Sequence, residues 1–163
     1  MSYTNGLDKP SDYFATKLYA GNDSGQSITM DFAPNWVWIK DRGGADPHGA
    51  YDSVRGALKQ LRVNLTNEER TLAGSLTAFN SDGFTVGNDD GTNDNAHNFV
   101  SWNWKETATA GFDIVSFTGN GSARTISHSL SAVPKMYIVK NRSTGSLQWR
   151  VYHNCFNAPL TLS

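Results

Sequence analysis

The chain has 163 residues, of which 18% are charged and 12% aromatic, and its formal net charge is −1. Its lysines and arginines are scattered, which excludes a surface for nucleic acid or an anionic membrane, because both need a clustered basic patch. The length suits one domain, or one and a half small modules, and the single cysteine excludes an intramolecular disulfide framework.

The N-terminal residues 1–12 are polar and carry Gly6 and Pro10, a composition that predicts an extended arm or linker. Such an arm often docks on a neighbouring molecule. No basic stretch leads into an apolar core, and no apolar run approaches the roughly 20 residues that span a bilayer. We therefore expect synthesis in a cytoplasm, with no cleaved secretion signal and no membrane insertion.

Three short apolar or alternating segments follow, at residues 14–19, 26–32 and 35–41. The first two are separated by GNDSG, and glycine and asparagine tolerate the positive φ of tight turns. Ala33 and Pro34 separate the second from the third. This pattern predicts a three-stranded meander.

The segment from residue 52 to residue 72 is ambiguous. Five of its apolar residues have helical spacing, but Gly56 interrupts the pattern. These five are Val54, Ala57, Leu58, Leu61 and Leu65. Thr66 and Glu69 form a capping-box pattern, which predicts a helical turn over residues 67–72.

Residues 76–79 and 83–87 flank Asn-Ser-Asp and predict a hairpin, and residues 98–105 predict a strand. Alternation in that strand places three apolar side chains on one face, which we expect to point inward. These are Val100, Trp102 and Trp104. About ten short strands at regular spacing predict an all-β fold, an antiparallel β-sandwich or jelly roll with at most one or two short helical turns.

An internal repeat relates residues 14–42 to residues 112–142. Aligned pairs include Phe14 with Phe112, Gly21 with Gly119, Pro34 with Pro134, Lys40 with Lys140, and the segment 51–53 with 152–154. The repeat predicts strands at 112–118, 123–130 and 135–141, and a division into an arm (1–12), a first β module (13–106) and a partial second copy (107–163). Either the partial copy completes the first sandwich or the sequence belongs to a longer protein, and we favour the longer protein.

The tryptophans allow two interpretations. An exposed indole offers an apolar face that matches a pyranose ring, whereas a buried indole fills the core or a subunit interface. Trp36 and Trp149 are the candidates for glycan contact, because their counterparts in the repeat differ. Cys155 is expected to be a small buried apolar residue.

A loop at residues 88–95 concentrates side-chain oxygens, which are the ligands that Ca²⁺ prefers. The candidate ligands are Asp89, Asp90, Asn93 and Asp94. The loop lacks EF-hand spacing, and loops rich in Asp and Asn also form for turn reasons alone. The sequence therefore predicts no cofactor, or calcium at this loop.

Catalytic patterns are missing from the sequence. It carries no GxSxG, HExxH or P-loop motif, and its four histidines, His48, His97, His128 and His153, lack ligand spacing and are expected at the surface or in turns. A glycan depolymerase would need an acid pair assembled from distant segments. The candidates for such a pair are Asp31, Asp52 and Asp82. We therefore expect that the protein is not an enzyme.

Several strings together resemble a repeat domain of uncharacterised function found in tail-fibre-like and other virion proteins of marine bacteriophages. They include GLDKPSDYF, FAPNWVWIKDR, FNSDGFTVG, FVSWNWK, AGFDIVSFTGNG and PKMYIVKNRS. The resemblance covers nearly the whole chain. It implies a lectin-like β-sandwich and a virion structural protein, and it brings no catalytic residue.

The function expected from these observations is a bacteriophage virion structural protein, located in the virion as a module of a tail or head fibre. It would contact other virion proteins, form a homo-oligomer, with a trimer favoured because fibres are commonly trimeric, and also bind a host-surface glycan. It would bind no nucleic acid. One alternative is a capsid decoration or adaptor protein that clamps neighbouring subunits, and another is a fibre-associated glycan depolymerase.

Overall fold

The computed structural model describes residues 9–155 and 160–162. Its strands are β1 (Phe14–Ala20), β2 (Gln26–Thr29), β3 (Trp36–Asp41), β4 (Gly49–Asp52), β5 (Lys59–Arg62), β6 (Arg70–Thr71), β7 (Leu76–Asn80), β8 (Gly83–Val86), β9 (Asn98–Trp104), β10 (Met136–Val139), β11 (Trp149–His153) and β12 (Leu160–Leu162). The short helical segments are η1 (Pro10–Asp12) and α1 (Asp90–Asn93).

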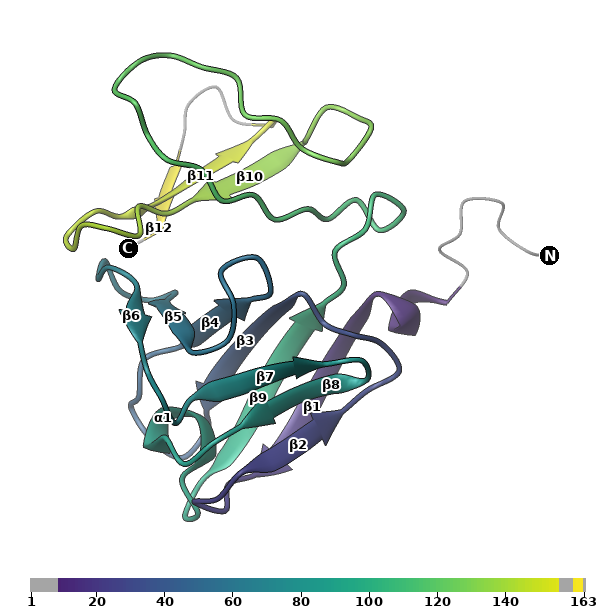
Figure 1. The fold of residues 1–163 in the computed structure, drawn as a ribbon, viewed down its shortest axis with the longest axis vertical. Helices are drawn as coiled ribbons and strands as arrows, with labels where there is room; N and C mark the ends of the chain where they lie inside the picture. The colour runs from purple at the N-terminus through teal and green to yellow at the C-terminus, as the bar shows by residue number, and fades with distance from the viewer. Residues whose placement is uncertain (1–8, 156–159, 163) are drawn as a thin grey trace.

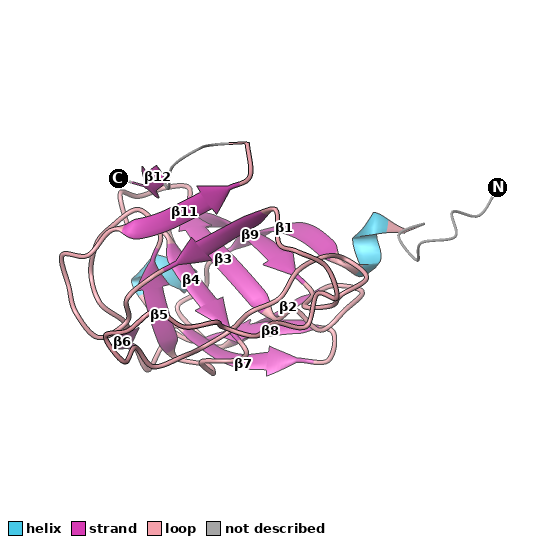
Figure 2. Cartoon of the chain, turned by 90° about the horizontal axis from the view of Figure 1, so that it is seen from above, coloured by secondary structure: helices cyan, strands magenta, loops and turns pink. Residues whose placement is uncertain are grey.

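Two antiparallel sheets form the main body of the protein. A six-stranded sheet in the order β1-β9-β3-β4-β5-β6 faces a three-stranded sheet in the order β2-β8-β7. The two lie on opposite sides of the body, and a third sheet, β10-β11-β12, lies beyond one end of it (Figure 1). The view from above shows the same layers (Figure 2). The predicted all-β antiparallel sandwich is confirmed.

The core fills the space between the two facing sheets. Val37, Ile39 and Phe99 project from the larger sheet, and Phe84 and Val86 from the smaller one, each with 0% exposure. Successive side chains of a strand point to opposite faces, so each strand supplies every second residue to this layer. Burying a side chain of this size contributes about 1.5–3 kcal/mol.

The predicted meander is wrong. β1 and β3 do not neighbour each other, because β9 lies between them and pairs with both. β2 crosses to the other sheet, where it pairs with β8. On that sheet Ile28 is buried in the core, as are Met30 and Phe32 in the segment that follows.

The predicted inward face of β9 is also wrong. Phe99, Ser101 and Asn103 are the buried residues, with 0% exposure, and the tryptophans of β9 point away from the core. The Asn103 Nδ2 donates to Ala15 O at 2.9 Å and to Ser101 Oγ at 3.0 Å, whereas its Oδ1 is buried without a hydrogen-bond partner among the described residues. The donor half of the amide is thus satisfied inside the sheet, which lowers the cost of burying it.

The segment 52–72 forms turns and strands β5 and β6 in place of a helix. Gly56 and Leu58 have φ of +91° and +69°, which no right-handed helix allows. Glu69 does not cap a helix, because its carboxylate accepts from Arg55 Nη1 at 3.1 Å. The Arg55 guanidinium also pairs with Asp52, and only 4% of the Arg55 side chain is exposed.

The repeat preserves one hairpin and its register. β3 pairs with β4 so that Val37 faces Tyr51, and β10 pairs with β11 so that Tyr137 faces Tyr152. The hydrogen bond that closes each hairpin is also repeated, from residue 53 N to residue 35 O and from residue 154 N to residue 135 O, at 2.9 Å in both.

The other two predicted strands of the second copy do not form. Residues 112–118 and 123–130 have no strand, although their counterparts in the first copy are β1 and β2. Among the described strands, β1 pairs with β9 alone and β2 pairs with β8 alone. The described part of the second copy holds no counterpart of β8 or β9, so these segments have no strand to pair with.

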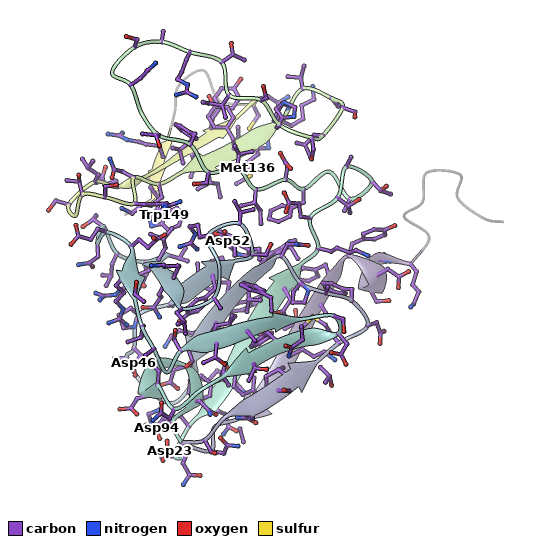
Figure 3. The ribbon with its side chains drawn as sticks, viewed as in Figure 1. Asp23, Asp46, Asp52, Asp94, Met136 and Trp149 are labelled. Carbon is purple, nitrogen blue, oxygen red and sulfur yellow. The ribbon has the colours of Figure 1, made fainter. Side chains whose placement is uncertain are left out.

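The second copy rests on the first through a few specific contacts. Trp149 is buried and its Nε1 donates to Arg62 O at 3.1 Å. Glu69 N donates to Arg142 O at 3.0 Å, and Arg142 Nε lies 3.2 Å from the Glu69 carboxylate. Figure 3 shows Trp149 between the third sheet and the main body.

The predicted division at residues 12 and 106 stays a prediction. Residues 1–8 of the expected arm lie outside the described part, and residues 10–12 form η1. In the described part of the chain, no helix has the length and apolar character needed to cross a membrane.

Candidate functional site: a tryptophan face

The outer face of the six-stranded sheet carries a row of aromatic side chains. Because β1, β9 and β3 pair in register, Trp104 lies beside Phe14 on one side and beside Trp36 on the other. Trp102 lies beside Trp38 in the same way. These five residues, Phe14, Trp36, Trp38, Trp102 and Trp104, are called the tryptophan face below.

The rings of the tryptophan face contact one another. The centroids of Phe14 and Trp104 are 4.9 Å apart, and those of Trp38 and Trp102 are 5.4 Å apart at an interplanar angle of 60°. Tilted pairs at these separations are favoured by the ring quadrupoles. The face is therefore held by the sheet register and by ring packing.

His48 fixes the orientation of one indole. Trp38 Nε1 donates to His48 Nδ1 at 3.2 Å, so that nitrogen must be unprotonated. Burial lowers the pKa of His48, and the positive charge of Lys40 lowers it further. The imidazole is thus held in the neutral form that accepts this hydrogen bond.

The face is apolar and partly open to solvent. All four tryptophans are half-buried, and Phe14 is 39% exposed. Leu18, four residues after Phe14 on the same face of β1, is 66% exposed and extends the apolar surface. Phe112 covers one end, with its ring centroid 6.4 Å from that of Trp104. Apolar surface of this kind commonly marks a contact site.

The two predicted glycan candidates have different positions. Trp36 belongs to the tryptophan face, where its role stays a prediction. Trp149 is only 5% exposed, so its expected exposure is wrong. It takes the place that His48 has in the first hairpin, and from there it packs on the main body. The sequence did not identify Trp38, Trp102 and Trp104 as part of one row, because their grouping depends on strand order.

A cleft of about 380 Å³ lies on the main body near α1. Its lining includes Asp46, Gln60, Arg70, Asp89 and Asp90. Burial raises the pKa of Asp89, and the positive charge of Arg70 opposes that shift. The cluster of acids here was not predicted, since Asp46 is distant in sequence from the other two.

The four candidate calcium ligands are not brought together as a site. Asp89 and Asp90 line the cleft, but Asn93 is fully buried elsewhere, and Asp94 Oδ1 accepts from Ala96 N at 2.7 Å. Among residues 9–155, no group of three or more histidine, cysteine, aspartate or glutamate side chains is arranged to hold a metal ion. Calcium stays a prediction without support from this geometry.

Asn93 connects the two sheets instead. Its Nδ2 donates to Asn22 Oδ1 at 2.9 Å, to Gly87 O at 2.5 Å and to Ser24 O. Its Oδ1 accepts from Asn22 N at 3.1 Å and from Gln26 Nε2 at 2.5 Å. The amide therefore ties the crossing from β1 to β2 to the segment after β8.

The three candidate acids of the depolymerase hypothesis do not line either of the two clefts described here. Asp31 and Asp82 are exposed, and Asp52 is buried in its ion pair with Arg55. A different pair does form, between Glu106 and Asp113. Burial and then the neighbouring Asp113 raise the pKa of Glu106, although this pair also lines neither cleft.

His97 and Cys155 are two further side chains of potential reactivity. His97 Nδ1 lies 2.8 Å from the buried Asp41 carboxylate, beside a cleft of about 160 Å³. This imidazole lies between the Asp41 and Asp94 carboxylates. The expected burial of Cys155 is wrong, because the residue is exposed in the turn that follows β11.

The sequence matches one protein family, described as "Domain of unknown function (DUF7483)", over residues 9–162. No curated protein and no solved structure matches the chain.

Proposed function

The chain belongs to the DUF7483 family of unknown function, and we propose that it is a non-catalytic binding and assembly module of a bacteriophage virion. In this proposal it is part of a tail or head fibre and makes its contacts through the tryptophan face. The observation that carries the proposal is the row of four tryptophans and Phe14 on the outside of the sheet. The location in a phage rests on the sequence resemblance.

The physical chemistry of the face suits binding. The indoles are fixed on a sheet and packed on one another, so a partner covers them without ordering flexible side chains. Rigid aromatic side chains are among the residues that dominate binding energies. A flat aromatic surface suits either the apolar face of a sugar ring or an apolar protein surface.

The capsid decoration or adaptor protein is the second candidate. The exposed Leu18 favours it, because an aliphatic side chain beside the aromatic row extends an apolar surface and offers no hydrogen bond to a sugar. The depolymerase gains no support, because the acids expected for it line neither of the two clefts described above. Both leading candidates use the same face, so one set of variants tests both.

We would replace Trp36 and Trp102 by alanine, singly and together, with the exposed Val133→Ala as a matched control away from the face. The readouts are analytical ultracentrifugation, and binding to polysaccharides purified from marine bacteria. The proposal predicts that the double variant loses at least about tenfold in polysaccharide affinity or loses self-association, while circular dichroism is unchanged. If the double variant equals Val133→Ala in both readouts, the tryptophan face is not the contact site.

A further inference from the structure

The two hairpins of the repeat bury different residues. In the first hairpin, Val37 and Ile39 face the core and are 0% exposed. Their counterparts Tyr137 and Val139 are 51% and 38% exposed. The second hairpin thus shows to solvent the side that is core in the first. Figure 3 shows that Met136, at the start of β10, lies above the main body.

The edges of the two hairpins differ as well. In the first copy β9 pairs along the whole of β3, from Trp36 with Trp104 to Asp41 with Phe99. Among the described residues, β10 pairs with β11 alone and is the edge strand of its sheet. β9 itself is paired on both sides, by β1 and by β3, and is not available to β10.

Within Met136–Val139, the described edge strand itself carries no charge, proline or bulge, although Lys135 and Lys140 flank it. Edge strands normally carry charges, proline or a bulge that prevents pairing with another chain. β10 reads Met-Tyr-Ile-Val, and its four side chains are between 38% and 51% exposed. An apolar, regular, uncovered edge of this kind is suited to accept a strand.

We propose that β10 accepts an extended segment of a neighbouring polypeptide, antiparallel to it and with the residue pattern of β9. The first copy shows what such a segment looks like, because small polar residues of β9 face Val37 and Ile39, and tryptophans face Trp36 and Trp38. The partner segment therefore has aromatic residues opposite Met136 and Ile138, and small polar residues opposite Tyr137 and Val139.

The strand register determines which backbone N–H and C=O groups of β10 are free to hydrogen-bond to the partner segment. Residue 154 N donates to Lys135 O, so Lys135 and every second residue after it face β11. Met136 and Ile138 then turn their N–H and C=O groups to the open edge. In β9 the even-numbered residues direct their backbone N–H and C=O groups to β3, as the hydrogen bond from Arg42 N to Asn98 O shows. The odd-numbered residues direct theirs to β1, in line with the hydrogen bond from Lys105 N to Tyr13 O just before that strand.

This proposal deepens the assembly role proposed above by naming the kind of segment that is bound, and it rests on that role. It concerns a surface other than the tryptophan face, so the strand-binding proposal and the proposed function can be refuted independently. Loss of binding in the Trp36 and Trp102 variants tests the function. Binding of a strand at β10 is tested with those residues intact.

The probe is a fluorescein-labelled synthetic peptide with the sequence HNFVSWNWK of residues 97–105, added to the full 163-residue chain. Fluorescence anisotropy measures its affinity, and hydrogen exchange locates it. We expect saturable binding, with slower exchange of the amides of Met136 and Ile138. A peptide N-methylated at Trp102 is expected to bind at least about tenfold more weakly, because it loses a ladder donor. The matched peptide N-methylated at Ser101 keeps its affinity, because that N–H points away from β10.

Four results would overturn the proposal. The first is no binding of the unmodified peptide. The second is equal weakening by the two methylations, since that is not strand pairing. The third is exchange protection in β3, which would show that the peptide displaces β9. The fourth is a dimer whose Met136 and Ile138 amides are protected before peptide is added, which would show β10 pairing with a second copy.

Discussion

Replacing Asn93 by alanine is expected to lower the free energy of unfolding by about 2–4 kcal/mol. The amide has two N–H bonds and two acceptor lone pairs, so at most four of its five contacts are made fully at once. Each contributes about 1 kcal/mol net. The partner atoms on Asn22 and Ser24 belong to exposed residues and regain water in the variant, whereas the carbonyl of the half-buried Gly87 faces the space that the amide leaves.

A loss of this size is a large fraction of the roughly 5–15 kcal/mol that stabilises a typical domain. Urea unfolding followed by tryptophan fluorescence measures it, and the midpoint should fall while the slope stays constant. The exposed Asn95→Ala is the matched control, with an expected change within about 0.5 kcal/mol.

Asn93→Asp separates the hydrogen-bonding role from calcium binding. Aspartate keeps an acceptor oxygen and would serve calcium at least as well as asparagine, but it removes both donors and buries a charge. We expect it to destabilise the fold at least as much as alanine does, in calcium and in EDTA alike. A variant as stable as the wild type in calcium, together with a wild type that EDTA destabilises, would refute this reasoning and make Asn93 a calcium ligand.

Three other variants test separate parts of the fold. A Cβ at Gly21 would overlap a backbone carbonyl oxygen, whereas nothing lies within 4 Å of a Cβ at its repeat counterpart Gly119. Gly21→Ala should therefore abolish cooperative unfolding, and Gly119→Ala should leave the unfolding midpoint unchanged. Equal effects would show that the two turns are equivalent. Trp149→Ala should speed hydrogen exchange throughout β10 and β11, with Trp149→Phe giving a smaller increase because packing is kept and one hydrogen bond is lost; unchanged exchange in both would mean that this indole does not hold the second copy in place. Burial raises the pKa of Asp89, so the folded state binds its proton more readily than the unfolded state, and stability falls as pH rises from the unfolded value of about 3.9 through the raised value. Asp89→Asn should therefore be more stable than the wild type near neutral pH, with a difference that shrinks toward pH 3; a difference independent of pH would contradict the assigned cause.

Local patterns predicted the elements that depend on local chemistry. The hairpin of β7 and β8 follows from its turn residues, and β1 and β3 follow from alternation within a few residues. The antiparallel sandwich follows from many short strands with regular spacing. None of these depends on a contact between distant segments.

The errors came from contacts between distant segments. β9 carries large apolar residues on one side and Phe99 on the other, so alternation alone does not tell which side is buried. In the structure Phe99 joins the core, and Asn103 on the same side donates to Ala15 O of the neighbouring strand. The segment around Arg55 turns because Glu69 and Asp52 pair with that guanidinium. The tryptophan face follows from β9 lying between β1 and β3, an order that no local pattern reveals.

Two hairpins of the chain share the same strand register but differ in their pattern of burial. One is formed by β3 and β4, and the other by β10 and β11. Val37 is enclosed while its counterpart Tyr137 is half open to water. A substitution profile made by stacking the two copies would therefore average positions under different constraints. Volume limits the residue in the first copy, and the capacity to meet another strand limits it in the second. Mutational tolerance in this family should therefore be analysed separately for each copy, with equivalent positions defined by the strand register.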